Sequence, residues 1–126
     1  MMNKRLVKNG DKVTVVIYTT PSLDSLSVFI EKKHFTVRKS GTKTFMLGSS
    51  CYYQSGIGVP VDGVFHNVHH IVVPVGESAD EYVSVAQKSI HAHSLKVKKS
   101  AQAIISAMDG IVGKLDDMPV TESHYE

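Results

Sequence analysis

A basic segment near the middle of the chain carries the residue types that bind phosphate. Five cations lie within twelve residues that contain no acid: Lys32, Lys33, Arg38, Lys39 and Lys43. Side chains of a β-strand alternate between its two faces, and one face then receives Lys32, His34, Thr36 and Arg38. Sheets bind nucleic acid by placing Lys and Arg against phosphates and polar or aromatic groups against bases. The segment therefore predicts a nucleic-acid surface, and a basic face that meets only solvent is the alternative.

Histidines on a later strand extend this predicted surface. A strand from Val64 to Val73 places His66 and His70 on one face, and imidazole rings can stack on unpaired bases. The length of the connection before the neighbouring strand decides whether Lys43 or Thr44 joins them. The predicted RNA-binding residues are Lys32, His34, Thr36, Arg38, Lys43, Thr44, His66 and His70.

The seven histidines do not predict a metal site. On a strand, His69 and His70 face opposite ways, and His66 lies ~13 Å from His70. On a helix, His91 and His93 diverge by roughly 200°. No cysteine or carboxylate is spaced to complete a four-ligand site, and no cofactor is predicted.

Sequence motifs of catalysis are missing as well. The chain has no nucleophile elbow, no paired acids beside a histidine and no glycine-rich phosphate loop at a strand-to-helix turn. We therefore predict that the protein is not an enzyme. A metal-dependent or histidine-dependent enzyme is the alternative from that class.

The composition predicts one folded domain, residues 1–126. A chain of 126 residues buries one core, and its 42% hydrophobic and 21% charged residues indicate neither disorder nor a membrane span. Secretion is not supported, because Met1 to Val7 leads directly into polar turn residues. The single cysteine, Cys51, excludes an intramolecular disulfide and is predicted to be a buried thiol.

The middle of the chain is unusually poor in charge. From Thr44 to Gly76 the only charged residue is Asp62, whereas about 25% of residues are charged in an average soluble domain. A strand without charge on either face has its faces or its edge covered. In so small a chain, that cover is predicted to be another subunit or a bound polymer.

Hairpins are predicted in the first half of the chain. Asn9-Gly10 predicts a hairpin between residues 6–8 and 11–17, because both residues tolerate the positive φ of a type I′ turn. Strands 26–37 and 43–53 are predicted to form a second hairpin across Lys39 to Thr42. The next predicted strand is 64–73.

Two helices are predicted at the C-terminal end. Ser78-Ala79-Asp80-Glu81 is a capping box that starts the first helix, and residues 101–115 repeat apolar side chains at helical spacing. One helix of about 37 residues would span ~55 Å at ~1.5 Å per residue, whereas a compact domain of this size is only ~36 Å across. A break between His91 and Lys99 is therefore predicted, unless the helices reach over a partner subunit.

The order of these parts resembles the coat proteins of the single-stranded RNA bacteriophages. The resemblance covers roughly residues 30 to 115. The stretches that carry it are Thr36-Val37-Arg38-Lys39-Ser40, Lys43-Thr44-Phe45-Met46-Leu47, Val59-Pro60-Val61, Ile71-Val72-Val73-Pro74-Val75 and Ala107-Met108-Asp109-Gly110-Ile111-Val112. No one of these stretches is specific alone, and their order and spacing carry the likeness.

The resemblance implies a fold, a partner and a place of action. It implies dimers whose sheets join edge to edge and whose helices clasp the partner. The exposed sheet face would line an icosahedral shell and bind an RNA hairpin that represses replicase translation. The loop from Gln54 to Gly63 would make contacts around the symmetry axes. The protein would reside in the virion, assembled in the host cytoplasm.

The sequence thus predicts an α+β fold with an N-terminal β-hairpin, an antiparallel meander and two C-terminal helices on one face of the sheet, in an intertwined homodimer. The predicted function is that of a coat protein that forms a shell and packages single-stranded RNA, without a membrane partner. The alternative is a small dimeric nucleic-acid-binding regulator that forms no shell.

Overall fold

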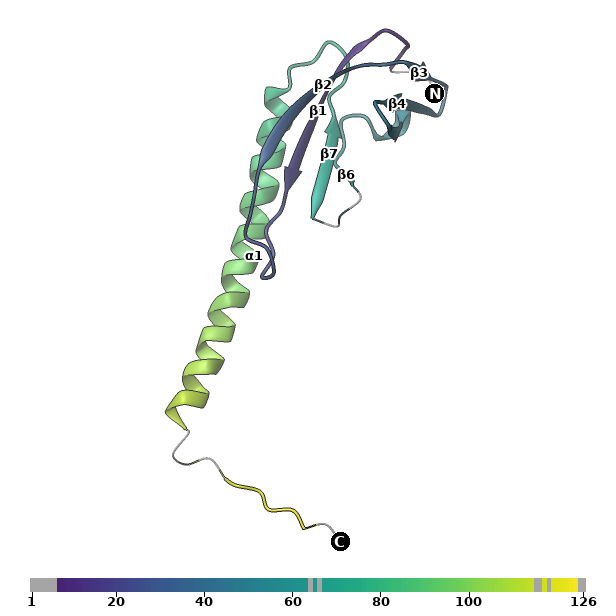
Figure 1. Cartoon of the computed structure of the whole chain (residues 1–126). Coiled ribbons are helices and arrows are strands. Elements are labelled where there is room, and N and C mark those ends of the chain that lie inside the picture. The colour runs from purple at the N-terminus through teal and green to yellow at the C-terminus, as the bar shows by residue number, and fades with distance from the viewer. Residues whose placement is uncertain (1–6, 64, 66, 115–116, 118, 125–126) are drawn as a thin grey trace.

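The computed structural model describes residues 7–63, 65, 67–114, 117 and 119–124 and shows two antiparallel sheets and one long helix (Figure 1). The α+β class is therefore confirmed. The main sheet has the strand order β2-β1-β7-β6, and its strands are β1 (Lys12–Thr19), β2 (Ile30–Thr36), β6 (Val61–Asp62) and β7 (Val68–Val72). The small sheet has the order β3-β4-β5, with β3 (Lys39–Ser40), β4 (Thr44–Leu47) and β5 (Ser50–Tyr53). A short 3-10 helix, η1 (Gln54–Gly56), follows β5.

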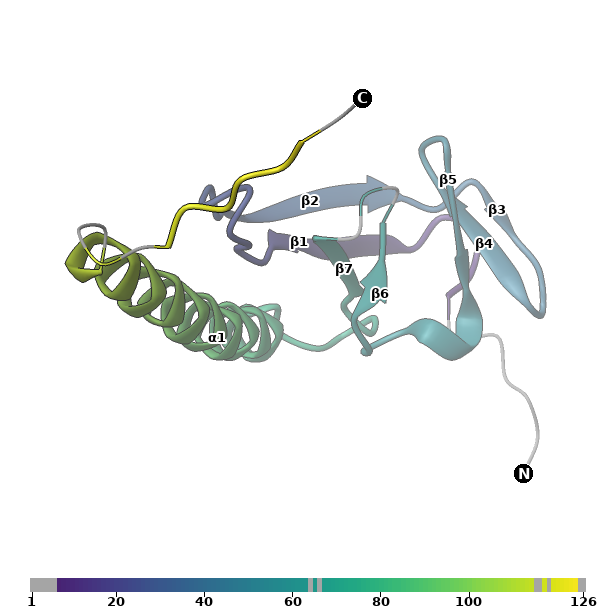
Figure 2. The same ribbon diagram turned by 90° about the horizontal axis from the view of Figure 1, so that it is seen from below.

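Each face of the main sheet has its own cover. One apolar cluster includes Val13 and Val15 of β1 together with Phe45 and Leu47 of the small sheet. The other includes Val16, Tyr18 and Ile71 with Ala86 of the helix. Because side chains alternate along β1, this central strand contributes to both clusters. Figure 2 shows the helix and the small sheet lying apart, with the main sheet between them.

The predicted N-terminal hairpin is wrong, although its turn forms. Gly10 has φ 87°, and the Asp11 N–H donates to the Lys8 carbonyl at 3.1 Å. Neither Val7 nor Lys8 is in a strand. Strand β1 pairs instead with β2 and β7, so both of its edges are occupied by strands from further along the chain.

The predicted second hairpin is also wrong. Strand β2 pairs with β1, whereas β4 pairs with β3 and β5 in a separate sheet. The stretch 43–53 is divided at Gly48, whose φ of 60° reverses the chain between β4 and β5. The predicted strands therefore exist in shorter form, with different neighbours.

A single helix, α1 (Asp80–Gly113), replaces the two predicted helices. The predicted break between His91 and Lys99 is absent because that stretch contains neither Pro nor Gly. Its 34 residues correspond to ~51 Å at ~1.5 Å per residue, and the helix extends well past the end of the sheet (Figure 1). The helix begins at Asp80, within the predicted capping box, but the N-cap residue is Ala79. The Ser78 hydroxyl oxygen accepts a hydrogen bond from the Asp80 N–H at 3.2 Å.

Within the described residues, no helix is both long enough and apolar enough to cross a membrane.

Candidate nucleic-acid interface

The basic segment lies at an edge of the main sheet. Strand β2 is the outermost strand, with β1 as its neighbour on one side. Lys32 and Lys33 are exposed on β2, and Arg38, Lys39 and Lys43 are exposed on the following connection and hairpin. The structure therefore keeps the five cations of this segment in solvent.

The register separates the predicted RNA-binding residues onto two faces. Thr36, His34 and Lys32 lie opposite Lys12, Thr14 and Val16 of β1. This is the face on which α1 packs, because Val16 belongs to the cluster that contains Ala86. His70 lies opposite Ile17, which belongs to the cluster on the other face. The single surface predicted for β2 and His70 is therefore not formed.

The remaining predicted residues belong to other parts of the chain. Arg38 lies between β2 and β3, and Lys43 precedes β4. Thr44 is half-buried at the start of β4 in the small sheet. His66 lies outside the described residues.

Two polar contacts join β1 and β2 on the helix-side face. Lys12 Nζ donates to Thr36 Oγ1 at 3.0 Å, and Thr14 Oγ1 lies 2.9 Å from His34 Nδ1. Neither Lys12 nor Thr14 was predicted from the sequence. The Lys-x-Thr alternation at 12–14 is visible there, but it gains meaning only when β1 is known to pair with β2.

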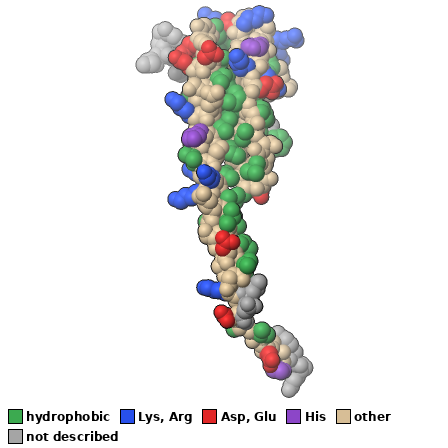
Figure 3. Space-filling view, turned by 90° about the vertical axis from the view of Figure 1, so that its left-hand side faces the viewer, with side chains coloured by type: hydrophobic (Ala, Val, Ile, Leu, Met, Phe, Trp, Pro, Cys, Tyr) green, Lys and Arg blue, Asp and Glu red, His purple; other side chains and the backbone are tan. Residues whose placement is uncertain are grey.

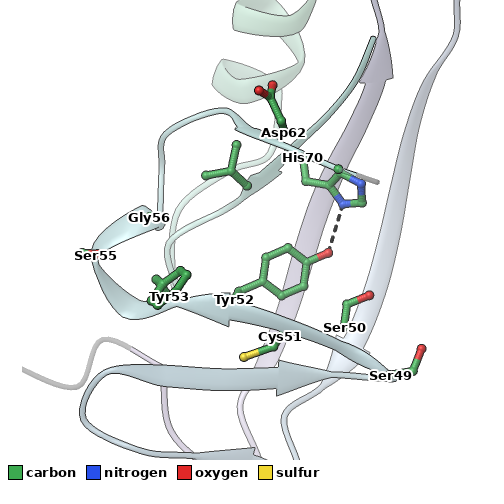
Figure 4. A pocket seen from close by; sticks show the side chains of 11 residues that line it. Ser49, Ser50, Cys51, Tyr52, Tyr53, Ser55, Gly56, Asp62 and His70 are labelled. Carbon is green, nitrogen blue, oxygen red and sulfur yellow. Dashed lines mark hydrogen bonds between the residues drawn. The ribbon is translucent and has the colours of Figure 1, made fainter. Parts of the chain in front are cut away.

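A pocket opens between β5 and the β6–β7 edge (Figure 4). Its volume is about 680 Å³, and Tyr52, Tyr53 and His70 are among its lining residues. The Tyr52 hydroxyl lies 3.0 Å from His70 Nδ1 and links the two sheets. Cys51, predicted to be buried, is exposed and also lines this pocket. Aromatic rings and hydroxyls of this kind can stack on, and hydrogen-bond to, a flat uncharged ring.

Burial sets the protonation of the linked pair. It raises the pKa of Tyr52 above 10.0, against the lowering effect of a hydrogen bond with Ser50. Burial also lowers the pKa of His70 below 6.5, and the nearby Lys33 and His69 lower it further. At neutral pH both the Tyr52 hydroxyl and the His70 imidazole are therefore uncharged, and one hydrogen bond joins them.

A second polar chain has the connectivity of a hydrolase triad. Asp62 Oδ1 lies 3.0 Å from His69 Nδ1, and His69 Nε2 lies 3.3 Å from Thr20 Oγ1. The hydroxyl of a nucleophile must be open to substrate, but Thr20 is only 5% exposed. Its backbone N–H donates to Asn67 and so cannot bind an oxyanion. These three side chains thus link β6 and β7 to Thr20, the residue that follows β1. Among the described residues, no three His, Cys, Asp or Glu side chains are grouped to hold a metal ion.

The apolar stripe of α1 continues beyond the sheet. Its first part packs on the sheet through Tyr82, Ala86 and Ile90. The same 3-and-4 spacing continues to Ile104, Met108 and Ile111, which are 50%, 51% and 47% exposed. Figure 3 shows a band of hydrophobic side chains that runs down the body of the molecule and along the projecting helix.

A comparison of the chain with protein-family models, with curated proteins and with solved structures found no match.

Proposed function

We propose that this chain is a coat protein that dimerises, assembles into an icosahedral shell and packages single-stranded RNA. The carrying observation is the stripe of α1, which runs the length of the helix although the sheet of one copy covers only its first part. The residues of the uncovered part are Ile104, Ile105, Met108, Ile111 and Val112, each 47% to 67% exposed.

The free energy gained by burying the exposed apolar side chains of α1 favours self-association. Burying one large aliphatic side chain contributes roughly 1.5–3 kcal/mol, and contiguous exposed apolar surface on a soluble protein marks an interaction site. A second copy presents the same stripe and the same sheet, so a two-fold pair buries both stripes at once. This supports a dimer in which each helix reaches over its partner.

A groove beside the helix offers a place for the partner's stripe. It has a volume of about 520 Å³ and is lined on one side by Val28, Phe29 and Ile30 and on the other by Ile90 and neighbouring residues of α1. Val28 and Phe29 are 46% and 47% exposed. Uncovered apolar side chains thus flank the docked part of the helix, as a clasped pair of copies requires.

The outer edge of β2 supports sheet-to-sheet joining. An edge strand presents backbone N–H and C=O groups that a second strand can pair with. Strand β2 has seven residues, compared with two in β6 at the other edge of the main sheet. It is therefore the longer template for a continuous sheet across a dimer.

RNA binding is supported by the exposed cations from Lys32 to Lys43. Each cation that neutralises a phosphate releases counterions, which makes binding strong at low salt and independent of sequence. A modest basic excess in one subunit sums to a strongly positive lining over a closed shell. The pocket of Tyr52 and His70 lies between the two sheets and supplies aromatic rings for unpaired bases.

Electron microscopy of the purified protein, with nuclease digestion of the bound RNA, tests the proposal. Closed particles that contain nuclease-protected RNA are the expected result. A stable dimer of about twice 13.8 kDa, with RNA that the nuclease degrades, would instead identify a regulator without a shell.

Charge substitutions on α1 test the interface separately from RNA. Met108→Glu with Ile104→Glu places two carboxylates on the stripe, and monomers are expected in light scattering. Gln102→Glu with Ser106→Glu adds the same charge to other exposed positions of the helix and should leave the dimer intact. Dimers in both double variants would rule out the stripe as the interface.

A further inference from the structure

A small cleft lies on the ladder between β1 and β2, on the face where α1 packs. Its volume is about 180 Å³, and it is lined by Lys12, Val13, Thr14, His34, Phe35 and Thr36. Four of these residues are polar, and they form two cross-strand pairs: Lys12 with Thr36, and Thr14 with His34. Lys12, His34 and Thr36 are exposed, so the cleft is open although α1 covers another part of this face.

The polar groups of the cleft are arranged as hydrogen-bond donors. Lys12 Nζ contacts Thr36 Oγ1 at 3.0 Å, and an ammonium carries three N–H bonds, so it has two more to donate. Thr14 Oγ1 lies 2.9 Å from His34 Nδ1. Whichever of the two atoms donates, the pair keeps one donor for a ligand: His34 Nε2–H in one case and the Thr14 O–H in the other. The cleft therefore presents a cation and at least one neutral donor.

The charge of the cleft selects an anion. None of the described residues that line it is Asp or Glu. Glu31 is on the same strand, but it alternates to the other face because it lies opposite Ile17. Lys32 lies on the cleft face two residues from His34, about 6.6 Å along the strand. Positive charge thus continues beyond the cleft along β2.

We propose that this cleft binds a phosphate group, with Lys12 as the charged ligand and Thr14, His34 and Thr36 as polar ligands. The proposal deepens the proposed function, because it names a phosphate contact on the sheet face opposite the Tyr52–His70 pocket. Lysine is a point-charge binder of phosphate, and hydroxyl and imidazole groups complete such sites. The phosphate belongs either to the RNA backbone or to a free phosphate.

Titration with inorganic phosphate, followed by NMR, tests the cleft without RNA. Backbone signals of Lys12, Thr14, His34 and Thr36 are expected to shift. Lys12→Met should weaken phosphate binding about tenfold, the loss that one charge-assisted hydrogen bond brings, and Lys12→Arg should restore most of it. Lys33→Met is the matched control, because it removes one charge from β2 on the opposite face. Equal losses in the two methionine variants, or none in either, would overturn the cleft.

RNA then identifies the source of the phosphate. A short single-stranded oligonucleotide that shifts the same signals and competes with inorganic phosphate assigns the cleft to the RNA backbone. If the oligonucleotide binds but does not shift these signals, the cleft is a site for free phosphate.

The outcome for the cleft is separable from the outcome for the shell. If the protein forms RNA-filled particles but the NMR signals of the cleft do not shift with phosphate, the phosphate site is rejected and the proposed function stands. If the cleft binds phosphate but the protein forms no particle, the phosphate site stands and the coat-protein function is rejected.

Discussion

Gln54 joins three distant segments of the chain through one amide. Its oxygen accepts from the Val7 N–H at 3.0 Å, and its nitrogen donates to the carbonyls of Val7 at 2.9 Å and Gly41 at 3.2 Å. The residue is only 4% exposed. Buried backbone groups must be paired. Val7 has no neighbouring strand to pair with, and the Gln54 side chain provides hydrogen bonds to its backbone instead.

Gln54→Leu is expected to lower the free energy of unfolding by roughly 1–3 kcal/mol, because the buried N–H of Val7 loses its partner. The Val7 carbonyl keeps its hydrogen bond from the Ser40 hydroxyl. Urea unfolding at fixed protein concentration measures the change. Gln102→Leu, on an exposed position of α1, is the control and should stay within about 0.5 kcal/mol of the parent. A similarly small change for Gln54→Leu would show that water forms the hydrogen bond to the Val7 backbone in the variant.

His70 makes stability depend on pH in a defined direction. Its pKa in the folded protein is below the ordinary 6.5, so the unfolded chain binds more protons between the two values. The stability contribution is therefore complete above pH 6.5 and is lost as the pH falls toward the folded pKa. The charges and titratable groups near it are Lys33, His69 and Tyr52.

His70→Gln should reduce the loss of stability between pH 7.5 and pH 5. The measurement is the difference in free energy of unfolding between the two pH values for the parent and the variant. His91→Gln, on an exposed position of the helix, serves as the control and should keep the parent's dependence. An unchanged dependence in His70→Gln would show that other groups dominate.

At the scale of elements, the sequence located strands better than it paired them. Alternation in residues 30–36 correctly placed Lys32, His34 and Thr36 on one face, because that property is local. It could not show that β1, with Val13, Val15 and Val16 fully or almost fully buried, takes the centre of the sheet and pairs with β2. Lys12 and Thr14 were missed for the same reason.

The helix shows a different limit of sequence reasoning. The periodicity of residues 101–115 correctly indicated helix as far as Gly113, where α1 ends. The break was inferred only from the size of a compact single copy. That argument fails when part of a helix is stabilised outside its own domain. The continuous stripe from Ala86 to Ile111 was the better signal, because a true break usually shifts the apolar phase.

Hydrogen exchange should divide α1 into two parts. Amides of residues 84–94 are expected to be protected at any protein concentration, because the sheet covers this part of the helix. Amides of residues 100–112 should gain protection as the concentration rises and dimers form. Met108→Glu with Ile104→Glu should abolish that gain while leaving the first part unchanged. Equal protection in both parts at high dilution would show that the projecting helix needs no partner.

At the scale of the whole molecule, the basic segment of residues 32–43 and the apolar stripe of α1 occupy different places. The exposed cations Arg38 and Lys43 belong to the segment around the small sheet, whereas the free end of α1 lies at the far end of the molecule (Figure 1). Substitutions of one surface should therefore leave the other working.

Arg38→Ala with Lys43→Ala is expected to reduce the RNA content of particles and to flatten the salt dependence of binding by about 0.7 per lost phosphate contact. Dimers should persist, which light scattering checks. Absorbance at 260 and 280 nm measures the RNA content. RNA content equal to that of the parent would exclude this segment from packaging.

Cys51 offers a chemical handle on assembly. The chain has one thiol, and it is exposed on the β5 side of the pocket. A maleimide dye therefore modifies each subunit at one defined point without any engineered substitution. Comparing the labelling rates of dissociated and assembled protein would show whether neighbouring subunits shield Cys51. A dye attached to the dissociated protein would report the association of subunits through a change in its fluorescence.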